Sequence, residues 1–157
     1  MARTRQSDRE FAATYDMMTG APVGNVVSGG AVDVDISDHI RAMAPGRRYV
    51  ALHTHRTSTS FSDADALLLV ANRAIRTIAV VGADGTWYLL SKVRGAGVAG
   101  ANRLVQAFTS AAIALSRRYL ALAQSGAVTP EEALRQFSHE IWQHIAPPLH
   151  LRYDRVR

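Results

Sequence analysis

Residues 48–75, "RYVALHTHRTSTSFSDADALLLVANRAI", contain the clearest local signals for the fold of this chain. Residues 48–55 form a short apolar run compatible with a central β-strand, and two histidines, His53 and His55, stand at its C-terminal end. A Ser/Thr-rich loop follows, and residues 63–75 have the length and composition of a helix. The stretch therefore predicts a strand, a polar loop and a helix that folds back over the strand end.

Two further strands and a turn are predicted near the N-terminus. Residues 10–16 and 23–29 have the side-chain pattern of strands, and Thr19 with Gly20 supplies turn chemistry between them. We therefore expect a β-hairpin in this region.

A strand and a short helix are predicted between the hairpin and the central stretch. Residues 31–36 alternate apolar with acidic side chains, as in a strand with one solvent-exposed face. Ser37 and Asp38 offer an N-cap to a short helix, which Pro45 ends.

The second half of the chain predicts a strand pair and then a helical pair. Residues 77–93 form two β runs joined by a turn at 83–85, and the glycines of 95–100 mark a linker. A long amphipathic helix that ends near Ser125 follows, with its apolar positions at Leu104, Phe108, Ala111, Ala112, Leu115, Tyr119 and Leu122.

A second helix is expected to begin where Thr129 provides a cap and Pro130 occupies the first turn. Glu132 would complete a capping box, and Pro147 would end the helix. The apolar stripe of the preceding helix fits two roles: it would pack on the sheet, or it would form a dimer interface.

The length indicates one domain, and the order of the predicted strands and helices indicates the α/β class. We expect a mixed β-sheet flanked by helices, with a C-terminal helical pair. The chain has 157 residues, 48% of them hydrophobic and 20% charged, which is typical of a globular protein with a substantial core. We divide it into a charged N-terminal arm (1–8), a core (9–95) and a helical extension packed on the same domain (96–157). No apolar run is long enough to span a bilayer and no secretory signal is visible, so we expect a cytoplasmic protein without membrane contacts.

The net charge of +5 comes almost entirely from arginine, since Lys92 is the only lysine among 18 basic residues. The arginines are scattered and are not interleaved with aromatic residues. We therefore expect a solvated basic surface rather than a nucleic-acid site.

A metal site is the main functional hypothesis for the central stretch. Because the chain has no cysteine, a metal would have to be held by His, Asp or Glu. His53 and His55 are two positions apart on a strand, so both imidazoles point to the same face. Asp65, in the first turn of the next helix, would be the third ligand, and three protein ligands are the number found in catalytic zinc sites.

Ser62 and Asp65 also fit a purely structural interpretation. Ser62-x-x-Asp65 has the spacing of a capping box, in which the serine side chain accepts from a backbone N–H and the aspartate reaches back. Alternatively, the Ser62 hydroxyl would donate to an oxyanion. The two interpretations compete for the Asp65 carboxylate.

These residues together resemble the JAB/MPN (JAMM) zinc metallopeptidase signature. Glu10, the pair His53 and His55, and Ser62 with Asp65 match its early-strand Glu, its H-x-H pair and its Ser-x-x-Asp. The similarity is greatest to the bacterial and phage-associated branch, and it covers about residues 10–93. There are two departures: Arg56 replaces the usual proline, and the loop before Ser62 is one residue shorter.

The resemblance implies a Zn2+-dependent peptidase or isopeptidase. His53, His55 and Asp65 would hold the zinc, Glu10 would be the general acid/base, and Ser62 would steady the oxyanion. Asp16, Asp33 and Asp35 are competing candidates for the base.

The partner implied by the resemblance is a polypeptide substrate. The settings that the family suggests are a ubiquitin-like or sulfur-carrier tail, a phage structural protein, and a bacterial toxin module. The alternative within the same fold is a catalytically inactive module that binds a partner protein.

A second histidine-rich stretch, residues 138–144, "SHEIWQH", is similar to the zincin helix. That motif needs histidines four positions apart, whereas His139 and His144 are five apart and would lie about 140° apart around a helix. We expect these two histidines at the surface or in packing and Trp142 in the core. His39 and His150 have no neighbours at ligand spacing.

Overall fold

The computed structural model describes residues 9–30 and 34–157. Its strands are β1 (Phe11–Asp16), β2 (Val27–Ser28), β3 (Tyr49–Thr54), β4 (Ile75–Val81), β5 (Trp87–Lys92) and β6 (Leu151–Val156). Its helices are α1 (Ser37–Ala42), α2 (Asp63–Ala71), α3 (Ala101–Gln124) and α4 (Pro130–Ile145), followed by a 3-10 turn (Pro147–Leu149). The predicted arm, 1–8, lies outside the described residues.

The strands form one six-stranded mixed sheet in the order β2-β1-β3-β4-β5-β6. Strands β3 and β4 are parallel, and the other neighbouring pairs are antiparallel. A parallel pair needs a crossover connection, and α2 provides it between β3 and β4. The predicted class, a mixed sheet flanked by helices, is confirmed.

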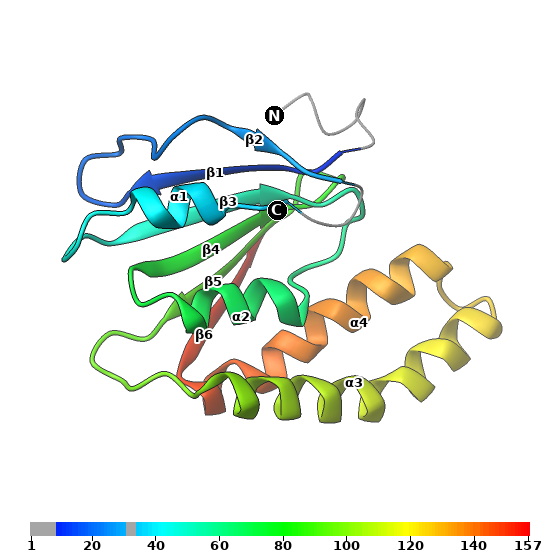
Figure 1. Ribbon diagram of the computed structural model, residues 1–157. Helices are drawn as coiled ribbons and strands as arrows, with labels where there is room; N and C mark the ends of the chain where they lie inside the picture. Colours follow the sequence, from blue (N-terminus) through cyan, green and yellow to red (C-terminus); the bar gives the residue numbers. More distant parts are fainter. Residues whose placement is uncertain (1–8, 31–33) are drawn as a thin grey trace.

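The helices pack in layers on the sheet. In Figure 1, α2 lies between the sheet and α3, and α3 and α4 form an antiparallel pair that extends past the sheet. The centre of the core is fully buried, and burial of each large side chain there contributes roughly 1.5–3 kcal/mol. Its largest members include Trp142, Tyr88, Phe61, Leu69 and Ile75.

The predicted helical pair is present at the expected positions. Gly126, with φ of 72°, ends the first helix in the left-handed conformation that glycine adopts without strain. The Thr129 hydroxyl accepts a hydrogen bond from the Glu132 backbone N–H at 3.1 Å. The Glu132 carboxylate instead accepts from Gln136, so only half of the expected capping box forms.

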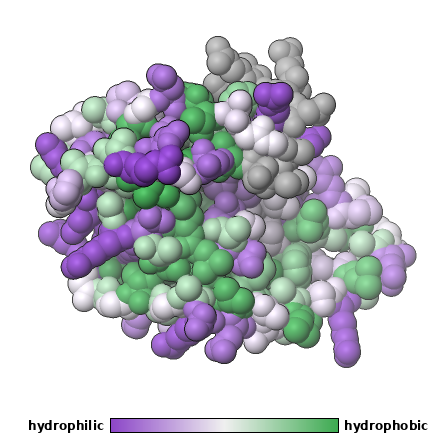
Figure 2. Space-filling view, in the orientation of Figure 1, coloured by the Kyte–Doolittle hydropathy of each residue, from purple (hydrophilic) through white to green (hydrophobic). Residues whose placement is uncertain are grey.

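The surface of the pair mixes residue types. Along the lower rim of Figure 2, where Figure 1 places α3, hydrophobic and hydrophilic residues are interspersed. No helix in the described ranges has the length and apolar character needed to cross a bilayer.

Three local predictions need correction. The described part of the predicted strand 31–36, residues 34–36, is not in a strand, and Ile36 rather than Ser37 occupies the N-cap position of α1. The helix predicted over 63–75 ends at Ala71, because the chain must turn to begin β4.

The C-terminal strand β6 was not predicted. It pairs antiparallel with β5 and extends the sheet beyond the expected strands. Residues 151–156 of the helical extension are thereby hydrogen-bonded into the same sheet as the core.

Candidate metal centre

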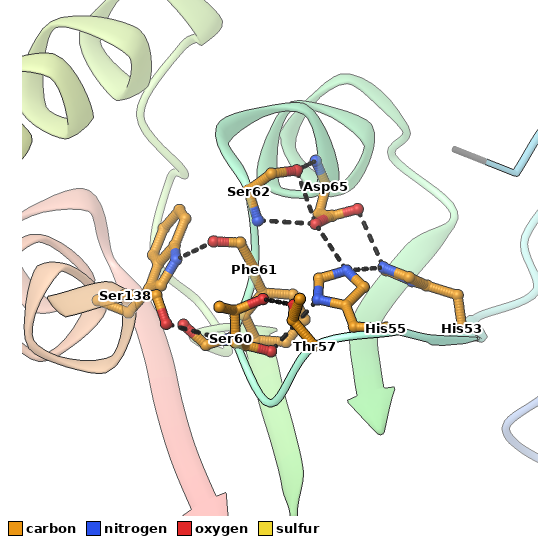
Figure 3. Close-up of polar contacts among 10 residues, drawn as sticks. His53, His55, Thr57, Ser60, Phe61, Ser62, Asp65 and Ser138 are labelled. Carbon is orange, nitrogen blue, oxygen red and sulfur yellow. Dashed lines mark hydrogen bonds and ion pairs between the residues drawn. The ribbon is translucent and has the colours of Figure 1, made fainter. Parts of the chain in front are cut away.

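The two histidines of the central stretch meet at the end of β3. His53 is the fifth residue of the strand and is 7% exposed. The His55 backbone N–H donates to the Val81 carbonyl at 2.9 Å, which continues the alignment with β4 past the strand end. Because the backbone stays extended, both rings point the same way, with their Nε2 atoms 3.0 Å apart (Figure 3).

Asp65 faces this pair from the first turn of α2, as predicted. Its Oδ1 lies 3.0 Å from His53 Nε2, and its Oδ2 lies 3.6 Å from His55 Nε2. Oδ2 also accepts from the Ser62 backbone N–H at 2.7 Å, while Ser62 Oγ accepts from the Asp65 backbone N–H at 3.2 Å. The capping box and the contact with the histidines therefore form together, and the expected competition for this carboxylate does not occur.

The Ser62 hydroxyl is engaged in the same contact. Its Oγ donates to Asp65 Oδ2 at 2.7 Å (Figure 3). In this arrangement the hydroxyl proton fixes the carboxylate that faces the histidines. The oxyanion role of Ser62 stays a prediction.

The geometry of this triad fits a divalent metal. One nitrogen from each histidine and one oxygen from Asp65 all lie within 4.8 Å of one another. Two ligands bound to tetrahedral zinc at 2.0–2.2 Å are roughly 3.3 Å apart. His53 Nε2 lies 3.0 Å from both His55 Nε2 and Asp65 Oδ1, which is close to that value. The 3.6 Å approach of His55 Nε2 is to the other carboxylate oxygen, Oδ2.

The orientation of the His55 ring is set by its other nitrogen. Nδ1 lies 3.2 Å from the Thr59 carbonyl, which can only accept, so Nδ1 carries the proton. Nε2 of the neutral ring is then left as the acceptor, which is the form that binds a metal. Thr59 had not been singled out from the sequence, because its carbonyl reaches the ring only through the path of the loop.

The charges in the triad reinforce one another. Burial alone would raise the pKa of the Asp65 carboxyl, but the hydrogen bonds and charges of His53 and His55 outweigh it and hold that pKa far below its usual value. Burial alone would lower the pKa of His55, but Asp65 outweighs it and raises that pKa. The carboxylate is therefore fully ionised at neutral pH and available as a ligand.

Glu10 lies beside the triad, immediately before β1. It is 7% exposed and lines a small cavity of about 50 Å³ together with His53 and Asp65. Burial raises the pKa of the Glu10 carboxyl, against the charges of His55 and His53. A buried carboxyl with a raised pKa can exchange a proton nearer to neutral pH than an exposed one.

The competing acids are placed elsewhere. Asp16 shares the face of Glu10 but stands at the other end of β1, where it accepts from Met18 and Thr19 and lies 3.6 Å from Arg47. Asp35 is exposed and accepts from the Ser37 backbone N–H. Asp33 lies outside the described residues.

The loop between His55 and Ser62 is anchored from distant parts of the chain. Trp142 Nε1 donates to the Phe61 carbonyl at 2.8 Å, and Ser138 Oγ accepts from the Ser60 backbone N–H at 3.1 Å. Tyr88 Oη donates to the Ser58 carbonyl at 2.8 Å. Strand β5 and helix α4 thus fix the loop that joins the candidate ligands His55 and Asp65, an arrangement that the sequence does not predict.

One glycine allows this loop to approach the β4–β5 turn. A Cβ added at Gly82 would lie 3.1 Å from the Ser58 Cα, which is backbone and cannot rotate away. The Thr57 carbonyl accepts from the next residue, Ala83, at 3.2 Å. A larger residue at position 82 would therefore displace the loop.

The two histidines of the second stretch have separate partners. His139 Nδ1 lies 2.8 Å from Tyr153 Oη, whereas His144 Nδ1 lies 2.8 Å from the Glu140 carbonyl. Trp142 is fully buried, as predicted. Among the described residues, the triad of β3 and α2 is the only group of three or more His, Asp and Glu that could hold an ion.

Comparisons with models of protein families, with curated proteins and with solved structures found no match. Membership of the JAB/MPN family therefore stays a prediction. What the structure itself establishes is the convergence of two imidazoles and one carboxylate next to a buried glutamate.

Proposed function

We propose that this protein is a zinc-dependent peptidase or isopeptidase that hydrolyses an amide bond. The observation that carries the proposal is that one ligand atom each from His53, His55 and Asp65 lie within 4.8 Å of one another, and that Glu10 lines a small cavity together with His53 and Asp65. The assignment of zinc follows the donor set, because two imidazoles and one carboxylate are typical of catalytic zinc sites that keep one open position.

His53, His55 and Asp65 would hold the zinc, which when bound supplies Lewis acidity and lowers the pKa of a water. Glu10 would take the proton that the attacking water loses, because it is buried next to the ligands and its pKa is raised. The water oxygen forms the new bond to the carbonyl carbon, the C–N bond breaks, and Glu10 passes the proton to the leaving nitrogen. One water is consumed for each bond cleaved.

The polypeptide nature of the substrate follows from the resemblance alone. The substrate would need to present an amide carbonyl beside Glu10 and the ligand atoms. A ubiquitin-like tail, a phage structural protein and a target of a toxin module all satisfy this requirement. We therefore propose the reaction type and the residues, and we name the substrate only by its class.

Metal content provides the first test. We expect about one zinc per chain in the purified protein and in Glu10→Gln, and almost none in His53→Ala. His139→Ala is the matched control, since its ring contacts Tyr153 and has no ligand neighbours. Inductively coupled plasma mass spectrometry measures the metal, and a wild-type chain that takes up no zinc would rule out the proposal.

Hydrolysis provides the second test and separates the enzyme from the non-catalytic alternative. A peptide library incubated with the zinc-loaded chain and read by mass spectrometry should show cleaved products. Glu10→Gln should lose them by roughly a hundredfold or more while keeping its zinc, because it removes the proton carrier only. If zinc-loaded wild type and Glu10→Gln were equally inert while a partner protein co-purified with both, the binding-module alternative would replace the enzyme.

A further inference from the structure

A basic cleft lies at the end of the sheet opposite to the metal centre. It has a volume of about 650 Å³ and is lined by side chains at the start of β3, the start of β4 and the end of β5. Small-molecule sites have volumes of about 300–1,000 Å³. The polar lining residues are Arg48, Arg76, Thr77, Ser91, Lys92 and Arg94.

Four cations converge on this cleft, and no carboxylate lines it within the part of the chain that the structure describes. Arg76 Nη2 donates to the Lys92 carbonyl at 3.2 Å, and Arg48 Nη1 donates to the Arg47 carbonyl at 3.2 Å. Both acceptors are neutral. Over residues 9–30 and 34–157, none of the four cations forms an ion pair.

Lys92, the only lysine of the chain, is the buried member of the group. It is 9% exposed, and its Nζ donates to the Asn72 carbonyl at the C-terminal end of α2 at 2.7 Å. Burial lowers the pKa of Lys92 to about 8, and the charges of Arg76 and Arg48 contribute in the same direction. The positive charges of the cleft therefore repel one another, and a bound anion would relieve this repulsion.

We infer that this cleft binds a small phosphate-bearing anion. A monocarboxylate would neutralise only one of the four charges, whereas a phosphate or pyrophosphate group carries several and matches the donor geometry of guanidinium groups. Thr77 and Ser91, whose hydroxyls lie 2.9 Å apart, add two hydrogen-bonding groups on the wall. The inference does not depend on the proposed peptidase function.

A nucleic-acid backbone fits the cleft less well. The cations come from three adjacent strand ends and surround one hollow, whereas a backbone needs charges spread along a track. The two ends of the sheet are also separated by the length of β3, which is about 13 Å between Tyr49 and His53. A ligand in the cleft is therefore distinct from a substrate at the metal centre.

Isothermal titration with inorganic pyrophosphate tests the inference. The full chain is first treated with a chelator and dialysed, so that pyrophosphate cannot bind through a metal at the other site. We expect saturable binding at low salt that Arg48→Gln/Arg94→Gln weakens roughly a hundredfold and Arg76→Gln weakens about tenfold. Both residues of the double variant are exposed, so its fold should be unaffected.

Arg117→Gln is the matched control, since this exposed arginine lies on α3 and does not line the cleft; it should keep wild-type affinity. Adenosine diphosphate forms a second arm: tighter binding than pyrophosphate would identify a nucleotide as the source of the phosphate. Absence of pyrophosphate binding, or equal binding by wild type and the double variant, would overturn the inference. So would binding of a single-stranded oligonucleotide that strengthens with its length and is lost in the same double variant, because the ligand class would then be nucleic acid.

Discussion

Residues 53–65 and residues 138–144 each contain two histidines and at least one acidic residue, but they fold into different structures. In the first stretch, two histidines on an extended backbone point to one side, and the following helix brings Asp65 to within 3.0 Å of His53. In the second, His139 and His144 lie on one helix and contact Tyr153 and a backbone carbonyl. Whether two histidine side chains meet depends on the side-chain repeat of the element that carries them. Alternate residues of a strand share a face, whereas helix residues five apart do not.

The second stretch nevertheless supports the first. Trp142 packs edge-on against Phe61, with ring centroids 6.2 Å apart, and its indole N–H holds the Phe61 carbonyl. Ser138 accepts from Ser60 one turn earlier on the same helix. The α4 stretch therefore has a structural role, which is to fix the loop between the candidate metal ligands His55 and Asp65.

The largest effect that tests this division of roles is expected from Trp142→Ala. Removing a fully buried indole should lower the free energy of unfolding by about 3–5 kcal/mol, through lost packing and an unsatisfied carbonyl at Phe61. His144→Ala, an exposed position two residues away, should change it by less than about 0.5 kcal/mol. Urea unfolding followed by circular dichroism measures both, and equal losses would contradict the structural role of Trp142.

A smaller effect is expected from substitutions at two helix caps, which should differ in their effect on zinc affinity. Ser62 and Thr129 both accept from a backbone N–H at a helix start, at 3.2 and 3.1 Å, so either substitution by Ala should cost about 1 kcal/mol of stability. Only Ser62 also donates to a metal-ligand candidate. Ser62→Ala should therefore weaken zinc affinity about tenfold, as loss of an outer contact does, while Thr129→Ala leaves it unchanged.

Competition with a chromogenic chelator measures the zinc affinity of both cap variants. An identical affinity in Ser62→Ala and wild type would show that Asp65 needs no help from the serine. An equal loss in Thr129→Ala would show that the effect passes through general destabilisation rather than through the carboxylate.

The elements that sequence reasoning predicted well are those with local signals. The apolar run before His53, the Ser62 cap and the repeat of apolar residues on α3 each depend on residues close together in the chain, so the metal triad could be anticipated from spacing. Strand β6 was missed because its partner β5 lies about 60 residues earlier and its own sequence is short and charged. Its alternation of apolar and charged residues is the signal that could have indicated a strand.

The supporting contacts of the site could not be predicted in the same way. Trp142 and Phe61 are separated by 81 residues, and their contact depends on how α4 packs over the sheet. The predicted competition for the Asp65 carboxylate does not occur, and the reason is physical. A carboxylate has two oxygens with about four acceptor positions, so Oδ2 can accept the capping hydrogen bond from the Ser62 backbone N–H while Oδ1 faces His53.

The smallest effect that separates the two stretches is the direction in which each histidine's contribution to folding stability changes with pH. The pKa of His55 is raised, because the effect of Asp65 outweighs that of burial, which alone would lower it. The pKa of His139 is lowered, by burial and by the charge of Arg155. A histidine with a raised pKa stabilises the fold fully below the unfolded value of about 6.5, and this contribution is lost as the pH rises through the folded pKa. A histidine with a lowered pKa has the opposite effect, because it destabilises the fold as the pH falls below about 6.5, where the unfolded chain binds the proton more readily.

Unfolding in urea at several pH values, with a chelator present, measures both contributions. The stability difference between wild type and His55→Gln should shrink as the pH rises above about 6.5. The difference between wild type and His139→Gln should instead grow as the pH rises towards that value, since the cost of burying a charged ring disappears. The same sign at both positions would mean that Asp65 does not pair with His55 in the metal-free protein, and the two stretches would then differ in spacing alone.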